Sequence, residues 1–487
     1  MLKGDRMLKK IGMIFPISAF FSILMAMLWV SPVLCADYLK GLDAYFKKDY
    51  ATAVRELMPL AEQGDAKAQY FVGVLYSIGR GVERNDKQAM YWTRKSAENG
   101  DAFAIYSIAE SYQNGFLVDK DINESIRWYE KLANKNDVKA QIKLGFLYDT
   151  KLDDFEAAAN WYKKAIEQAD DNTMYNSLGY DFEEQNGKGF ALYRLGLLYE
   201  KGGGVPLDNS AAVKNHKKAA ELGLEKAVSH LAWLHNLGPI ELRNYKEAAK
   251  WYLKLVNKGD YFAEYHLGKL YEEGKGVVQD YKKAFDLYSS SSAKGFILAD
   301  FRLANLYEKG NGVAQNYKEA IRLYIKVSDD GGNADASSAE LNLSTLYLEG
   351  KGVPQDYNKA FELARKAAEN HPAYSTDLRA YFFLALMYEA GIGTTQNYKQ
   401  AVIWSRKAAL LGVVEAQLKL SKFYSNGVGV LQNNIYSHMW SNVAASLGSK
   451  EAREIREKIS QSMTLEDISK AQELARRCIE NNYKKCE

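Results

Sequence analysis

Apolar and polar side chains alternate along most of the chain with the period of an amphipathic helix. Apolar residues recur three and four positions apart in stretches of about a dozen residues, and short turns separate the stretches. The apolar positions of one pair of stretches are Tyr265, Leu267, Leu270 and Tyr271 before the turn and Tyr281, Ala284, Phe285 and Tyr288 after it. Because this spacing gathers apolar side chains on one face, each pair of stretches predicts a helical hairpin.

The hairpin pattern recurs at a nearly fixed interval. Each copy has a small residue, here called the anchor, that stands three positions before a tyrosine, or before His235 in the fifth copy. The ten anchors are Gly73, Ala109, Gly145, Gly196, Ala232, Gly268, Ala304, Ser344, Ala385 and Ser421. Six of the nine intervals between them are 36 residues long. A register kept over ten copies indicates a tandem repeat.

Paired glycines mark the turn inside most hairpins. They stand six and eight residues after the anchor in seven copies, where the backbone needs angles that other residues adopt at a cost. The third copy has Lys151 and Asp153 instead, and the fifth has Gly238-Pro239 with no second glycine. Local structure is therefore least defined by the sequence at these two turns.

One hairpin cannot bury its own apolar face, so neighbouring hairpins must stack around a continuous core. The predicted fold is all-α, an α/α solenoid of about ten to eleven helix-turn-helix repeats. Repeats are expected at residues 65–448, after a degenerate N-terminal hairpin at 37–64. Two charged capping helices are expected at 449–487, and Thr464-x-x-Asp467 resembles a capping box at the start of the second.

The repeat resembles a known family. The segments AEYHLGKLYEEGKGVVQDYKKAFDLY and AELNLSTLYLEGKGVPQDYNKAFELARKAAE are similar to the Sel-one-like repeat (SLR), a relative of the tetratricopeptide repeat. The resemblance covers residues 37–448, and the segment that begins SHMWSNVAASLGSKEAREI is similar to the C-terminal cap of bacterial members. It implies a right-handed superhelix in which the first helices of the hairpins line a concave surface.

The resemblance also implies a function without catalysis. Family members act as scaffolds or adaptors of protein complexes in the bacterial envelope or after secretion, including contact with host cells. Two alternatives stay open. One is a secreted enzyme that binds or hydrolyses β-lactams, although the relatives associated with that activity carry a cysteine pair in each repeat, which this chain lacks. The other is a polysaccharide-export scaffold, although its lipoprotein relatives have a small residue where Leu34 precedes Cys35.

The first 36 residues have the composition of a signal peptide. A basic start is followed by the apolar run Ile11–Val30 and by small residues around Cys35 and Ala36. We expect export to the periplasm or beyond, with cleavage after Cys35 or Ala36. The alternative is an uncleaved anchor, because about twenty apolar residues can span a bilayer; the membrane would then be contacted through this segment alone.

Composition excludes several other classes of function. The formal net charge of the whole chain is only +3, which argues against electrostatic binding of nucleic acid. No phosphate loop, nucleophile elbow or zinc-protease motif occurs. His230 and His235 are five apart, which places them on different sides of a helix, so this pair predicts no metal site. We therefore expect no catalytic residues, cofactor or metal.

Two cysteines remain beyond the signal segment. Cys478 and Cys486 stand eight residues apart at the end of the last predicted helix. In an oxidising compartment a disulfide between them would fasten the cap. The alternative is a pair of free thiols.

The positions that differ between repeats are the candidates for partner binding. Two residues before and one residue after each anchor, the side chains vary freely while the anchor and tyrosine do not. Spacing of three keeps these two positions on one face of the first helix. The candidate residues are Phe71, Val74, Arg194, His230, Trp233, His266, Lys269, Arg302 and Asn305. The alternative is a merely solvated face, although exposure of Trp233 and Phe71 without a use is costly.

Overall fold

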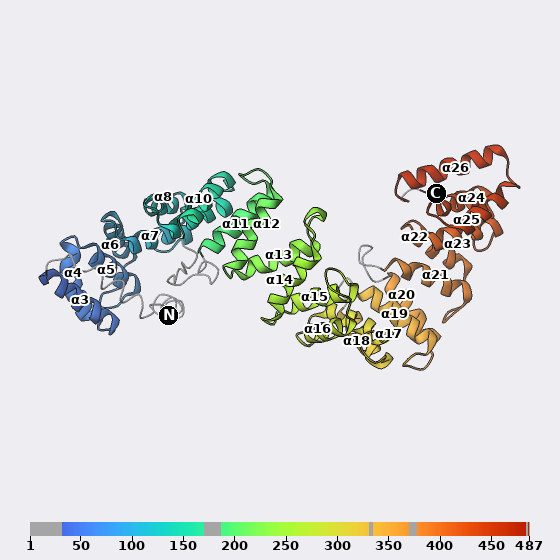
Figure 1. The fold of residues 1–487 in the computed structure, drawn as a ribbon, viewed down its shortest axis with the longest axis horizontal. Helices are drawn as coiled ribbons and strands as arrows, with labels where there is room; N and C mark the ends of the chain where they lie inside the picture. The colour runs from blue at the N-terminus through green and yellow to red at the C-terminus, as the bar shows by residue number, and fades with distance from the viewer. Residues whose placement is uncertain (1–31, 170–186, 331–334, 370–376, 484–485, 487) are drawn as a thin grey trace. The chain divides into compact units, whose positions relative to one another are not determined.

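The structure, a computed structural model, describes residues 32–169, 187–330, 335–369, 377–483 and 486. Within these ranges the chain forms 24 α-helices and one short 3₁₀-helix, and it contains no β-strand. Contacts divide the chain into two compact units, Met1–Arg243 and Asn244–Glu487 (Figure 1). Residues 1–31 of the predicted signal or anchor segment lie outside the described residues.

The first unit contains eleven of the described α-helices. They are α3 (Pro32–Phe46), α4 (Tyr50–Glu62), α5 (Ala66–Ile78), α6 (Asp86–Glu98), α7 (Ala102–Asn114), α8 (Ile122–Ala133), α9 (Val138–Lys151), α10 (Phe155–Gln168), α11 (Gly187–Lys201), α12 (Asn209–Glu221) and α13 (Glu225–Leu237), followed by the 3₁₀-helix η2 (Ile240–Leu242). Helices α3 and α4 cover the residues predicted as a degenerate hairpin.

The second unit contains the other thirteen. They are α14 (Tyr245–Val256), α15 (Tyr261–Glu273), α16 (Tyr281–Ala293), α17 (Ile297–Lys309), α18 (Tyr317–Asp330), α19 (Ala336–Glu349), α20 (Tyr357–Glu369), α21 (Leu378–Ala390), α22 (Tyr398–Ala409), α23 (Val414–Asn426), α24 (Asn434–Ser446), α25 (Lys450–Ser460) and α26 (Leu465–Glu480). Within each unit the helices pack on their neighbours in the sequence, except that α26 packs on α24 rather than on α25, so both units are α/α solenoids, as predicted.

Small anchors allow the two helices of a hairpin to approach closely. The ring of Tyr288 on α16 lies directly over Gly268 on α15, where a Cβ atom would be 2.9 Å from the ring. Tyr162 covers Gly145 in the same way. Both tyrosine side chains are fully buried. These two anchors are therefore small because an aromatic ring from the second helix occupies the space above them, whereas Gly73 is covered by Thr93 instead.

The paired glycines have two different roles. Gly202 ends α11 in the left-handed region with φ +65°, and a Cβ there would be 3.4 Å from Leu207. Gly204 has the same φ, but its Cβ would overlap the backbone of Phe155 and Glu156. This second contact recurs: each second glycine packs on the first residue of the second helix in the preceding hairpin. The pairs are Gly81–Tyr50, Gly204–Phe155, Gly276–Tyr245, Gly312–Tyr281, Gly352–Tyr317, Gly393–Tyr357 and Gly429–Tyr398.

Three turns lack the paired glycines. In the second copy Leu117 stands in place of the second glycine and adopts φ +64°, and the turns of the third and fifth copies differ locally, as the sequence indicated. Asp153 adopts φ +53° after α9, a conformation that aspartate tolerates better than most residues. Gly238 is extended instead, and η2 follows it. The left-handed step is thus retained by another residue in the second and third copies and replaced by a 3₁₀-helix in the fifth.

Helix starts are fixed mainly by aspartate and asparagine. The Asp260 side chain accepts a hydrogen bond from the backbone N–H of Ala263, and Asn244 does the same for Glu247. Thr464 caps α26 by accepting from the backbone N–H of Asp467. Each bond satisfies a donor that the helix itself leaves unpaired.

The C-terminal end is closed by α25 and α26, which pack on α24. A disulfide joins Cys478 at the end of α26 to Cys486, and both side chains are buried in the core of the second unit. No helix among the described residues is long and apolar enough to cross a membrane.

Candidate functional site

The nine candidate residues lie on first helices of five repeats. Phe71 and Val74 lie on α5, Arg194 on α11, His230 and Trp233 on α13, His266 and Lys269 on α15, and Arg302 and Asn305 on α17. They occupy the positions two before and one after the anchor, and the surroundings of these two positions differ.

Arg194 is held by the preceding repeat. Its Nε donates to Asp149 Oδ2 at 2.7 Å, and its Nη2 donates to the same oxygen. The Tyr162 hydroxyl donates to this carboxylate as well, at 3.3 Å. Only 8% of the Asp149 side chain and 22% of the Arg194 side chain are exposed. Arg194 therefore links neighbouring repeats and neutralises a buried carboxylate.

His230 forms the corresponding contact one repeat later. Its Nε2 lies 2.8 Å from Glu200 Oε1, and Nε2 of His216 lies 2.8 Å from the same oxygen. His216 is fully buried above the anchor Gly196. Burial lowers the pKa of His216. Burial alone would raise the pKa of Glu200, but the two imidazole hydrogen bonds outweigh it and hold this pKa at about 2.

Arg302 belongs to an equivalent group in the second unit. The Tyr288 hydroxyl donates to Glu272 Oε2 at 2.7 Å, and the guanidinium of Arg302 interacts electrostatically with both. Burial and the neighbouring Glu272 raise the pKa of Tyr288, so this hydroxyl stays protonated and acts as the donor.

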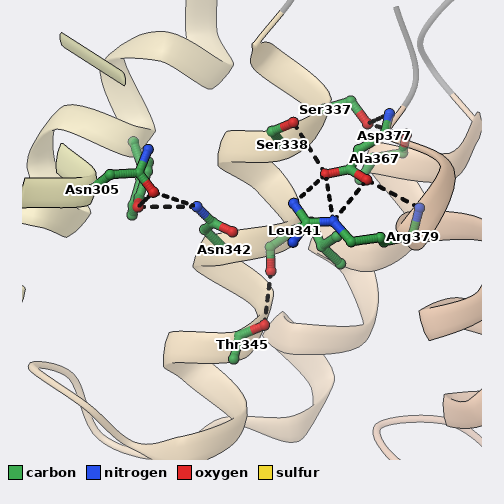
Figure 2. A network of polar contacts seen from close by, with 10 residues as sticks. Asn305, Ser337, Ser338, Leu341, Asn342, Thr345, Ala367, Asp377 and Arg379 are labelled. Atoms are coloured by element: carbon green, nitrogen blue, oxygen red, sulfur yellow. Dashed lines mark hydrogen bonds and ion pairs between the residues drawn. The ribbon is translucent and has the colours of Figure 1, made fainter. Parts of the chain in front are cut away.

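In the next repeat Asn342 stands two residues before the anchor, where Arg302 stands in the preceding one. The Tyr324 hydroxyl donates to Glu308 Oε2 at 2.6 Å and accepts from Asn342 Nδ2 at 3.0 Å. Asn305 lies beside them, with its Oδ1 3.5 Å from Asn342 Nδ2 (Figure 2). Figure 2 also shows how Ser338 and Arg379 converge on Asp377. Asn305 is thus part of an internal polar network on the face predicted to bind partners.

These contacts follow one rule, which the sequence interpretation missed. A polar or acidic residue four after one anchor meets the residue two before the next anchor. Lys419 and Glu389 obey it as well, with Nζ 2.9 Å from Oε1. The sequence did carry a signal, since Glu200–His230, Glu272–Arg302 and Glu389–Lys419 are all 30 residues apart. Much of the variation at this position is therefore complementarity between adjacent repeats.

His266 is also enclosed rather than open to solvent. Only 7% of it is exposed, and its ring stacks on Tyr252 at 5.4 Å and meets Phe262 at 4.3 Å and Tyr265 at 5.1 Å. Burial, reinforced by nearby Lys269, lowers the pKa of His266 to about 4. The imidazole is consequently neutral at pH 7.

The remaining candidates are partly exposed. Phe71 is half-buried against Tyr45, with ring centroids 5.1 Å apart. Val74 is half-buried, and Lys269 lies 3.9 Å from Glu273 on the same helix. These side chains are therefore only partly accessible to a partner.

Trp233 stands out because a large part of its ring remains in solvent. It is 41% exposed, and its ring stacks on His230 at 5.7 Å. Leu237, one helical turn further along α13, is 45% exposed, and Ile240 in η2 is 73% exposed. Residues four apart lie on one side of a helix, so Trp233 and Leu237 form one apolar strip. The sequence interpretation included Trp233 and overlooked Leu237 and Ile240.

Known proteins share this architecture. The Sel1 repeat pattern matches residues 66–101, 102–137, 138–170, 189–224, 226–260, 262–296, 297–331, 337–371, 378–413 and 414–449. The crystal structure of a protective antigen present in uropathogenic Escherichia coli strains, described as displaying an SLR fold, is 28% identical with a TM-score of 0.53. The match covers 88% of this chain and 96% of that one.

Two further comparisons are more limited. A Sel1 repeat protein from Oxalobacter formigenes is 26% identical over 52% of this chain and 99% of its own, with a TM-score of 0.42. The chitin synthase regulator SKT5 of Saccharomyces cerevisiae is 39% identical over 64 residues. Those residues are 13% of this chain and only 9% of the regulator.

Repeats of this kind generally mediate protein–protein interaction, and their solenoid is typically a non-catalytic scaffold. Ten copies account for well over half of the residues, and both the helical hairpins and the turn glycines recur in the structure. The chain belongs to the Sel1 repeat family.

Proposed function

We propose that this protein is a non-enzymatic scaffold that binds a partner protein or peptide through the apolar strip of α13. The observation that carries the proposal is the exposure of Trp233 and Leu237 on one side of a first helix. Tryptophan is enriched among the residues that dominate binding energy at protein interfaces. Arg194, two before the anchor of the preceding repeat, is engaged in an internal ion pair, whereas the strip of α13 is open to a partner.

The other candidate residues then have supporting roles. Arg194, His230 and Arg302 set the geometry of the first helices through their internal contacts. Phe71, Val74, His266, Lys269 and Asn305 stay candidates for secondary contacts along the face. Phe71 and Val74 lie in the same unit as Trp233, whereas His266, Lys269 and Asn305 lie in the other unit and are separate candidates there.

The test is site-specific photo-crosslinking in native cells followed by mass spectrometry. A photoreactive phenylalanine analogue at position 233 or 237 is expected to capture a specific partner. The same analogue at position 431 is the control, because Leu431 is 88% exposed but lies in a turn of the tenth repeat. Equal capture profiles at all three positions would contradict the proposal.

A mutational arm uses the captured partner. Trp233→Ala with Leu237→Ala is expected to weaken its binding at least about tenfold, which is typical of removing an interface hot spot. The circular-dichroism spectrum should still be that of a folded helical protein, because both side chains are partly exposed and lie outside the core. Unaltered affinity in the double variant would exclude this strip as the binding surface.

We also propose that the protein acts outside the cytoplasm, in the periplasm or beyond. The basic and apolar N-terminal segment supports this, and so does the pairing of Cys478 with Cys486, because disulfides persist in oxidising compartments. Cell fractionation with thiol labelling of the denatured, unreduced protein tests it. Recovery in the cytoplasm with both thiols reactive would refute it.

A further inference from the structure

The three side chains Glu200, His216 and His230 form a group that no other repeat matches among the described residues. One oxygen of Glu200 faces the Nε2 atoms of both histidines, each at 2.8 Å. The three atoms lie within 4.8 Å of one another. We propose that this group is a binding site for a divalent transition-metal ion of the zinc type.

The donor atoms select the class of metal. Two imidazole nitrogens and one carboxylate oxygen are ligands typical of zinc, and they also suit cobalt and nickel. Calcium and magnesium prefer sets made of oxygen atoms alone. Three protein ligands leave a fourth tetrahedral position for water or another ligand.

The two separations between the histidines and Glu200 require only a small expansion, and the two imidazole nitrogens lie within 4.8 Å of each other. Ligand bonds of about 2.1 Å in a tetrahedron place neighbouring donor atoms about 3.3 Å apart. The present separations of 2.8 Å from each histidine to Glu200 are shorter by about half an ångström, as expected when hydrogen bonds replace the metal. About a sixth of the Glu200 and His230 side chains is exposed, so these two can move and an ion can enter from solvent.

His216 supplies the rigid part of the site. Its ring is fully buried and fills the space above Gly196, where even a Cβ atom would be 2.5 Å from the ring. Tyr193 covers it from the side, with ring centroids 5.3 Å apart. Trp233 stacks on one side of His230, with ring centroids 5.7 Å apart, so the second ring can shift only within a limited space. Ligands that packing holds in place lose less entropy when an ion binds.

Neighbouring repeats show what the same positions look like without metal ligands. Tyr288, Glu272 and Arg302 occupy them in one repeat, and Tyr324, Glu308 and Asn342 occupy them in the next. Those groups are complete as hydrogen-bonded or charged networks, and each offers a metal no more than one strong ligand. In the Glu200 repeat, histidine occupies both the tyrosine position (His216) and the arginine or asparagine position (His230), and with Glu200 this gives three metal ligands.

This comparison also provides variants that preserve packing. His216→Tyr and His230→Arg each introduce the residue that neighbouring repeats use at that position. Because a tyrosine–glutamate–arginine group is compatible with the fold around Glu272, both variants are expected to fold and melt like the natural protein. Each removes one ligand.

The experiment titrates zinc chloride into the full chain, prepared without a histidine tag and dialysed against a chelator. Isothermal calorimetry should report one zinc ion per chain, and cobalt chloride should give visible absorption of a four-coordinate centre. Loss of a residue that only hydrogen-bonds to a metal ligand already weakens metal binding about tenfold or more. His216→Tyr and His230→Arg each remove a ligand itself, so each should weaken zinc binding at least about tenfold. His438→Asn, which changes a histidine of α24 outside the group, should leave it unchanged.

Two results would overturn the proposal. One is the absence of zinc binding and of the cobalt spectrum in the natural protein. The other is equal zinc affinity in the natural protein and in both variants, which would place any bound ion elsewhere. If either variant fails to fold, Glu200→Gln serves instead, because it keeps the shape of the side chain. Retention of the cobalt spectrum in that variant would equally refute the site.

Discussion

The paired glycines of one turn allow the contact between repeats to be measured separately from backbone strain. Gly202 and Gly204 share φ +65°, so alanine pays the same left-handed penalty at both, about 1–2 kcal/mol. A Cβ on Gly202 meets only Leu207 at an ordinary 3.4 Å, whereas a Cβ on Gly204 overlaps the backbone at the start of α10. Relief of such overlap requires a backbone shift that typically costs about 1–3 kcal/mol more.

We therefore expect Gly202→Ala to lower the free energy of unfolding by about 1–2 kcal/mol and Gly204→Ala by about 2–5 kcal/mol. Urea denaturation followed by circular dichroism gives the totals. Hydrogen exchange in peptides of α10 and α11 locates the damage, because only Gly204→Ala should loosen the start of α10. Equal losses in the two variants, or a larger loss at Gly202, would refute the idea that the second glycine sets the distance between repeats.

Two further predictions concern buried ionisable groups. Arg194→Ala should lower the free energy of unfolding by about 2–3 kcal/mol because it leaves Asp149 buried without its cation. Adding Asp149→Asn to this variant should restore about half of the lost stability, as measured by urea denaturation. If the effects of the two substitutions simply add, the two side chains do not interact. Burial lowers the pKa of His266 to about 4. Between about pH 6.5 and pH 4 the imidazole is therefore protonated in the unfolded chain but neutral in the folded chain, so stability falls as the pH drops below about 6.5. The loss between pH 7 and pH 4.5 should be about 2.5 kcal/mol, and His266→Phe should flatten that dependence; an unchanged slope in the variant would contradict the assignment.

The fold could be predicted from the sequence because the residues that each hairpin requires recur in ten copies. Small anchors, the tyrosines and the turn glycines are needed in nearly every copy, so their period identifies the hairpins directly. The left-handed steps at Leu117 and Asp153 could not be predicted because neither residue has the conformational signature of glycine, and the 3₁₀-helix after Gly238 occurs in one repeat alone among the described residues.

The candidate face was predicted only in part. Spacing along one helix indicated the exposed side of α13 that carries Trp233, but it cannot show that Arg194 is occupied by Asp149, which comes from another repeat 45 residues away. His230 was compared with His235, a near neighbour in the chain, whereas the structure places it beside His216 and Glu200. Such groups depend on which positions face one another between repeats, and that register becomes visible only after the hairpins are stacked.

The polar networks also define where such a chain can be cut and recombined. Glu272, Tyr288 and Arg302 all lie between the anchors Gly268 and Ala304, so a segment that begins at one anchor and stops before the next keeps these three together, although Tyr265, which also interacts with Arg302, stays outside it. A segment with the bounds of the family repeat, residues 262–296, contains the glutamate and the tyrosine but leaves the arginine behind. Grafts and duplications phased on the anchors should consequently transfer without new unpaired charges, whereas grafts phased on whole hairpins exchange partners at both junctions.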